Sequence, residues 1–211
     1  MDGHSGSDRR FTSIEENAEH IIDYIDENCG GKVLLIGGLS LGAQVLLEIL
    51  SRRSGTCRYA LIESAMVLPS YVAHAMIRAA FGAGYGLIRH RWFSKVQFQS
   101  LHIKQDLFED YYRDTCGIKK VDMIAFLEAS TEYSLKKTIR DCSAAVHIFF
   151  GQKETLGIKK SAEKIMEMIP GSNLKEMAGM YHGEFSINHA DAYVKEIKHI
   201  MTDPFTVSYP V

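Results

Sequence analysis

The sequence predicts one α/β domain over residues 1–211, with a mostly parallel sheet and flanking helices. Short apolar runs alternate with amphipathic helical patterns along the chain, which is typical of βαβ units. A length of 211 residues fits a single domain. The chain is 46% hydrophobic and its formal net charge is −2, so it can build a core and lacks the broad positive surface of nucleic-acid-binding proteins.

The first elements are marked by their end signals. A capping box of Ser13 and Glu16 predicts a helix start, and Gly30 ends that helix. The apolar run Lys32–Gly37 then predicts a strand that is buried on both faces of a parallel sheet. A second helix begins just after Ser40.

The later part of the chain continues the alternation after one interruption. Further strands are expected at Tyr59–Glu63, Val146–Phe150 and Leu174–Met177. Helical spacing of apolar residues follows at 162–169 and again at 193–201. Residues 66–141 break the rhythm with glycines, aromatic residues and the basic cluster Arg89–Arg91, and we expect a helical insert over the sheet. The basic cluster is interpreted as a solvated helix face.

The sequence gives no signal for a cofactor, a metal or a membrane span. The four cysteines lie far apart without a CxxC pair, which suggests free thiols in a reducing compartment. No apolar run approaches the ~20 residues that a spanning helix needs. The polar N-terminus does not look like a secretory signal. We therefore expect a cytoplasmic protein without cofactor or metal.

The motif Gly38-Leu39-Ser40-Leu41-Gly42 carries the strongest chemical signal. It is a G-x-S-x-G sequence with a buried strand directly before it and an amphipathic helix directly after it, which is the setting of a nucleophile elbow. Such a turn lifts the Ser40 hydroxyl above the sheet. It also places the N–H of Leu41 at a helix N-terminus, where it can stabilise a developing oxyanion.

Two further side chains complete a candidate triad. Glu154 follows the strand that ends at Phe150, and His182 lies in the loop after the last predicted strand. The chain order Ser, acid, His is the one found for triads on this architecture. His182 would take the hydroxyl proton of Ser40 and return it to the leaving group, while the carboxylate holds the ring.

These residues make the sequence resemble the α/β-hydrolase superfamily, specifically its small bacterial lid-bearing serine hydrolases, from Asp2 to about Met201. The segment Asp2–Asp8 resembles the family's D-x-x-G-H-G-x-S-D loop, which follows its fourth strand. The resemblance implies that the strand at Lys32 is the fifth and that residues 66–141 are the lid. It also implies an alternative acid, Glu63, where some members place theirs after the sixth strand.

The chain departs from the family pattern in two ways. Its expected acid is Glu154, where the family more often has Asp. The family's first strands, the third of which supplies a second oxyanion donor, have no counterpart before Asp2. We expect either a piece of a longer protein or a shortened variant. In both cases the strand at Lys32 has an exposed edge, through which the chain could form a homodimer.

The leading functional hypothesis is hydrolysis of a small to medium, fairly apolar ester through an acyl-Ser40 intermediate. Apolar residues of the insert would line the substrate pocket, with Met66, Val67, Leu68, Tyr71, Met76, Phe81 and Tyr85 as candidates. Hydrolysis of a C–C bond or a thioester would use the same triad. A non-catalytic binding protein that keeps the fold is the alternative from a different class.

Overall fold

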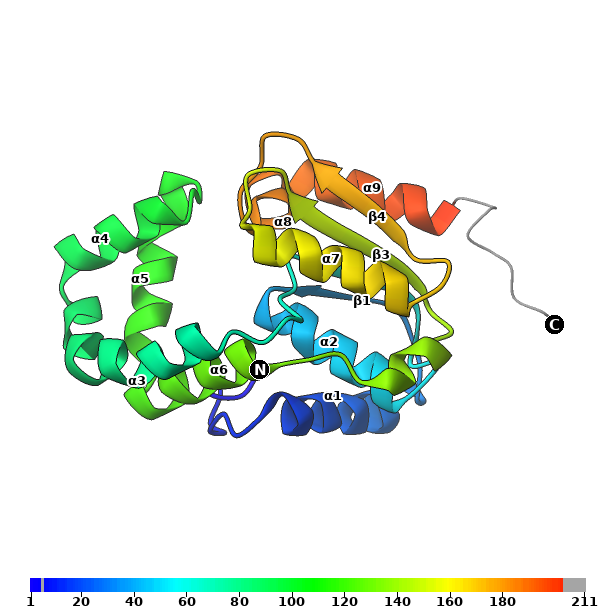
Figure 1. Ribbon diagram of the computed structural model, residues 1–211, viewed down its shortest axis with the longest axis horizontal. Helices are drawn as coiled ribbons and strands as arrows, with labels where there is room; N and C mark the ends of the chain where they lie inside the picture. The colour runs from blue at the N-terminus through cyan, green and yellow to red at the C-terminus, as the bar shows by residue number, and fades with distance from the viewer. Residues whose placement is uncertain (5, 203–211) are drawn as a thin grey trace.

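The computed structural model describes residues 1–4 and 6–202 and confirms the predicted α/β class (Figure 1). Within these residues, a parallel sheet has the strand order β1-β2-β3-β4, so each strand lies beside the next one in the sequence. The strands are β1 (Val33–Leu39), β2 (Cys57–Glu63), β3 (Ala145–Gly151) and β4 (Asn173–Met177). Helical segments connect the strands, as right-handed parallel crossovers require.

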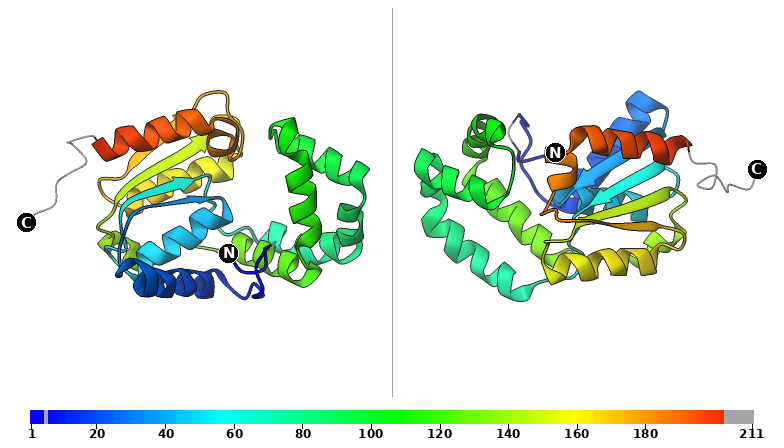
Figure 2. Two further views of the ribbon diagram at one scale, coloured as in Figure 1. Left: turned by 180° about the vertical axis from the view of Figure 1, so that it is seen from behind. Right: turned by 90° about the horizontal axis from the view of Figure 1, so that it is seen from above.

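Helices cover both faces of the sheet (Figures 1 and 2). One face packs against α1 (Ile14–Cys29), α2 (Leu41–Arg52) and α7 (Leu156–Met168). The other face packs against α8 (Glu184–Asn188) and α9 (Ala190–Thr202). Alternate residues of β2 divide between the two cores, because successive strand side chains point to opposite faces. Ala60 and Ile62 belong to the first core, and Tyr59 and Leu61 to the second.

The first helix begins and ends where its signals predict. The Ser13 side chain accepts a hydrogen bond of 3.0 Å from the N–H of Glu16, which satisfies one free donor of the first turn. The Glu16 carboxylate binds the hydroxyl of Thr12, so only half of the predicted capping box forms. Gly30 ends α1 in the left-handed conformation, with a φ of 64°.

Strand β1 differs from the expectation of a strand buried on both faces. It pairs with β2 alone and is an edge strand of the described sheet. Leu34 is 58% exposed, whereas Ala60, Leu61 and Ile62 of β2 are fully buried. The reason is position, since the start of an edge strand has a neighbouring strand on one side only. An apolar run by itself does not distinguish an edge strand from a central one.

The segment between β2 and β3 is mainly helical. Its helices are α3 (Tyr71–Gly84), α4 (Arg91–Ser100), α5 (Phe108–Gly117) and α6 (Lys120–Glu132). Short 3₁₀ turns join them at Tyr85–Arg89, Gln105–Leu107 and Lys137–Asp141. Figures 1 and 2 show this insert beyond the carboxyl ends of the strands. It therefore lies over the edge of the sheet where active sites form in open α/β folds.

The apolar residues expected to line a pocket have different environments. Val67 is buried in the main core. Tyr71 and Met76 are 81% and 63% exposed. One of these three side chains is therefore packed in the core and two are exposed to solvent, so the three do not line a common cavity. In the described part of the chain, no helix has both the length and the apolar character needed to cross a membrane.

Candidate active site

Ser40 occupies a strained turn between β1 and α2. Its φ is 54° and its ψ is −114°, a region that residues with a side chain rarely adopt and that is concentrated at functional sites. The backbone holds it there, since the Ser40 N–H donates to Glu63 O at 2.9 Å and the Ser40 carbonyl accepts from Gln44 N at 3.1 Å. The turn thus fixes the direction of the serine without help from its hydroxyl.

The two glycines of the motif have unequal roles. A Cβ at Gly38 would lie 2.4 Å from the carbonyl oxygen of Gly42, so only glycine fits there. A Cβ at Gly42 would have no atom within 4 Å, so that position does not require glycine for space. Of the two motif glycines, Gly38 alone is crowded by its neighbours. Leu41 is the first residue of α2, and its N–H belongs to the helix N-terminus as the sequence predicts.

Glu154 follows the end of β3, and its carboxylate receives three hydrogen bonds. Oε2 lies 3.0 Å from Nδ1 of His182. Oε1 accepts from Ser64 Oγ at 2.6 Å and from the N–H of Gly151 at 2.8 Å. Burial would raise the pKa of Glu154, but the hydrogen bonds from His182, Gly151 and Ser64 outweigh it and hold the pKa below its usual 4.5. The carboxylate is therefore ionised and oriented toward the imidazole.

His182 lies in the loop after β4, and close backbone packing brings that loop to the end of β3. A Cβ at Gly151 would lie 2.4 Å from the carbonyl oxygen of Met180, so glycine permits this approach. The His182 side chain is 47% exposed, whereas that of Glu154 is 1% exposed. A histidine held by a buried carboxylate and open on its other side has the arrangement of a general base.

The loop also reaches β1 through Gly183. A Cβ there would lie 3.0 Å from a methyl group of Leu39, the residue before Ser40. The structure thus brings the segments of Ser40, Glu154 and His182 to the same edge of the sheet, at the carboxyl ends of β1, β3 and β4. Within the described residues, the hydroxyl of Ser40 makes no hydrogen bond to His182.

Glu63, the alternative acid, has other partners. It ends β2 and is 2% exposed, and its Oε1 accepts from the backbone N–H of Ser186 in α8 at 3.2 Å. Its Oε2 is buried and has no hydrogen-bond partner in the described chain. Burial raises the pKa of Glu63 above 4.5, because the hydrogen bonds from Ser186 only partly offset the loss of hydration. Nearby Glu154 raises this pKa further.

Ser64 is a site residue that sequence reasoning missed. Its hydroxyl donates to Glu154, and it also lies 3.4 Å from the N–H of Gly183. Its φ of 55° makes it one of the few described residues other than glycine in the left-handed region. A serine at the end of a buried strand gives no sequence signal for this role, which depends on the partner from β3.

Two buried amides that the sequence did not single out attach the insert to the core. Gln44 in α2 donates to the carbonyl oxygens of Met66 at 2.6 Å and Ser130 at 2.9 Å, near the two ends of the insert. Asn188 at the end of α8 donates to the carbonyl oxygen of His102 at 2.7 Å and accepts from the N–H of Lys104 at 2.9 Å. The insert is therefore held at its base and again at the turn between α4 and α5.

A cavity of about 280 Å³ opens beside the acid and the histidine. The residues around it come from the end of α4, the loop after β3, the start of α7 and the loop after β4. They are Ser100, Leu101, His102, Lys153, Glu154, Thr155, Ile158, Tyr181 and His182.

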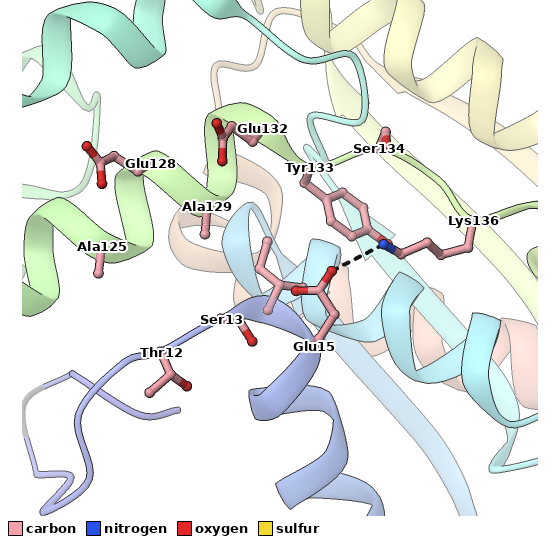
Figure 3. Close-up of a pocket in the computed structure, with 11 residues that line it drawn as sticks. Thr12, Ser13, Glu15, Ala125, Glu128, Ala129, Glu132, Tyr133, Ser134 and Lys136 are labelled. Carbon is pink, nitrogen blue, oxygen red and sulfur yellow. Dashed lines mark hydrogen bonds and ion pairs between the residues drawn. The ribbon is translucent and has the colours of Figure 1, made fainter.

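A second cavity, of about 350 Å³, lies between the start of α1 and the end of α6 (Figure 3). Its carboxylates already have partners. Glu15 pairs with Lys136 at 3.2 Å, and the other two are Glu128, bound by Arg78, and Glu132, bound by His74. None of the predicted site residues lines it. In residues 1–4 and 6–202, no group of three His, Cys, Asp or Glu side chains could hold a metal ion.

The chain resembles known proteins in structure rather than in sequence. In sequence, the chain matches no protein-family model and no curated protein. In structure, it is similar to a protein from Desulfitobacterium hafniense that is assigned to the α/β-hydrolase family, with a TM-score of 0.73 and 18% identity over 96% of this chain and 82% of that one.

Two further solved structures have comparable similarity. An esterase from Exiguobacterium antarcticum gives a TM-score of 0.77 and 16% identity, over 95% of this chain and 79% of that one. An enol-lactonase from Burkholderia xenovorans LB400 gives a TM-score of 0.77 and 14% identity, over 96% of this chain and 78% of that one. With nearly its whole length aligned to these structures, the chain has the α/β-hydrolase fold.

Proposed function

We propose that the chain is a serine hydrolase that cleaves a small to medium, fairly apolar ester through an acyl-Ser40 intermediate. The observation that carries this proposal is the pairing of His182 with the buried carboxylate of Glu154 at 3.0 Å, in a loop whose Gly183 packs against Leu39, the residue before the strained Ser40. Glu154 is the acid in this proposal, because Glu63 is bound to Ser186 instead.

In the acylation step, Ser40 Oγ forms a bond to the acyl carbon and its proton passes to Nε2 of His182. Nδ1 of His182 keeps its proton toward Glu154, whose negative charge stabilises the imidazolium. The N–H of Leu41 stabilises the oxyanion. The C–O bond then breaks, and the alcohol leaves with the proton from His182. Water attacks the acyl-enzyme in the same way, which releases the acid and restores Ser40.

An ester is the favoured substrate class because proteins of this fold named above include an esterase and an enol-lactonase, and a lactone is a cyclic ester. The missing hydrogen bond between Ser40 and His182 does not count against catalysis, since such contacts are often long before substrate binds. In this proposal, residues 66–141 act as a lid, supported by the insert's place over the carboxyl ends of the strands.

The non-catalytic alternative has one observation in its favour. Leu41 offers the N–H of a helix N-terminus as an oxyanion donor, and the proposal names no second donor. Loss of one donor costs roughly 10² to 10³ in kcat. We therefore expect low turnover from these 211 residues rather than none.

Labelling by a fluorophosphonate tests the proposal, because only an activated serine reacts with it. We expect one label on Ser40 of the wild type, and none on Ser40→Ala or His182→Ala. Ser40→Ala should also remove hydrolysis of short p-nitrophenyl esters, by as much as about 10⁶ in kcat for a working triad. Ser51→Ala is the matched control, because Ser51 is a buried serine on α2 whose hydroxyl donates a hydrogen bond to Leu47 O. Unchanged turnover in Ser40→Ala, or no labelling of the wild type, would reject the serine-hydrolase proposal.

A further inference from the structure

We propose that the cavity beside His182 binds the alcohol part of the substrate, and that Lys153 makes it selective for alcohols carrying an anionic group. The chemistry of such a group is a carboxylate or a comparable oxyanion attached to a small aromatic or aliphatic body. This inference rests on the proposed function, because it takes His182 as the residue that protonates the leaving alcohol.

The cavity lies beside His182, and this position indicates that it binds the leaving alcohol. The alcohol receives its proton from His182, so it must lie next to the imidazole when the C–O bond breaks. His182 and Glu154 line the cavity, whereas Ser40 does not. The acyl group stays bonded to Ser40, which does not line this cavity.

The walls of the cavity suit a small body with one charge. Leu101, Ile158 and the ring of Tyr181 supply apolar surface. Its volume of about 280 Å³ falls near the lower end of the usual range for small-molecule sites.

Lys153 supplies a positive charge that has no carboxylate partner within the described residues. Its Nζ lies 4.7 Å from the centre of the Tyr181 ring, an arrangement that holds the exposed ammonium at the wall. The one carboxylate that lines the cavity belongs to Glu154, whose side chain is 1% exposed and already bound by three donors. The charge that Lys153 presents to a ligand is therefore not neutralised locally.

The insert closes the other side of the cavity. The His102 ring stacks on Tyr181 with 3.6 Å between ring centres and an interplanar angle of 11°. Asn188 binds the backbone next to this stack, because it donates to His102 O and accepts from Lys104 N. Asn188 is 8% exposed, so these bonds are shielded from water. The turn between α4 and α5 is thus fixed over the loop that carries His182 (Figure 1).

A calorimetric titration tests the site without requiring turnover. The probes are 4-hydroxybenzoate and 4-hydroxybenzamide, which share one ring and differ in charge. We expect 4-hydroxybenzoate to bind about fivefold more tightly, since an exposed ion pair contributes up to about 1 kcal/mol. Lys153→Met should remove that difference and Lys153→Arg should restore it. Lys160→Met is the matched control, because Lys160 is an exposed lysine of α7 that does not line the cavity.

The binding results have clear consequences. Equal affinities for the two probes in the wild type, no saturable binding of either, or an equal loss in Lys153→Met and Lys160→Met would each overturn the proposal. A loss in Lys153→Met alone supports it.

Hydrolysis of matched esters then tests which side of the ester lies in the cavity. Lys153→Met should lower kcat/KM for 4-acetoxybenzoate about fivefold and leave 4-acetoxybenzamide unchanged. Phenyl hydrogen succinate, whose charge is on the acyl side, should be insensitive to Lys153. If Lys153→Met affects the succinate instead, the cavity binds the acyl group and our assignment is wrong. If the anionic probe binds as expected but the wild type hydrolyses none of the three esters, the proposed function fails while the binding site remains.

Discussion

Replacement of Glu154 by glutamine should lower kcat by about 10³ while the fold remains intact. At the observed separation of 3.0 Å, a carboxylate and an imidazolium attract each other by about 5 kcal/mol at an effective dielectric constant of about 20. That energy corresponds to nearly 10⁴ in rate. We discount it to about 10³, because the His182 side chain is 47% exposed and water screens the imidazolium. Glutamine has nearly the same volume, so the effect should come from the lost charge.

The matched control is Glu63→Gln, which makes the same chemical change in a carboxylate that is 2% exposed. We expect its kcat to stay within about fivefold of the wild type, because Glu63 binds Ser186 rather than His182. The assay is steady-state hydrolysis of p-nitrophenyl acetate, with thermal unfolding of each variant to show that it is folded. A larger loss in Glu63→Gln than in Glu154→Gln would refute the reasoning and make Glu63 the acid.

Three further predictions concern stability and assembly. Gly38→Ala should lower the free energy of unfolding in urea by about 1–3 kcal/mol, because the new Cβ meets Gly42 O, and equal midpoints for wild type and variant would contradict this. The raised folded-state pKa of Glu63 implies that stability falls as pH rises from 4.5 through that pKa. Glu63→Gln should remove this part of the decline. The Tm of the variant minus the Tm of the wild type should therefore increase as pH rises, and a difference that does not change with pH would argue against this prediction. We also propose self-association through the edge of β1, which Leu34→Lys should weaken in sedimentation experiments, and a strictly monomeric wild type would exclude it.

Much of the fold could be predicted because its signals are local. The apolar run before Ser40, the serine cap at Ser13 and the glycine at Gly30 each act over a few residues, and the structure places the elements within about two residues of the predicted ends. The burial of β1 could not be predicted in the same way. The resemblance to the α/β-hydrolase family predicted an exposed edge for this strand, which the described sheet has, whereas the apolar run alone predicted burial on both faces.

For the candidate site too, some features follow from the sequence and others only from the tertiary structure. The sequence by itself determined the residue types, their chain order and the strained turn at Ser40, because a tight βα turn is specified by its own glycine and the helix after it. Two carboxylates remained as possible acids, because Glu154 follows one predicted strand and the family resemblance implied Glu63 at the end of another. Only the tertiary structure decided that Glu154 contacts His182 and that Glu63 contacts Ser186. Those contacts join residues far apart in the chain, and their geometry depends on how loops and helices pack around the sheet.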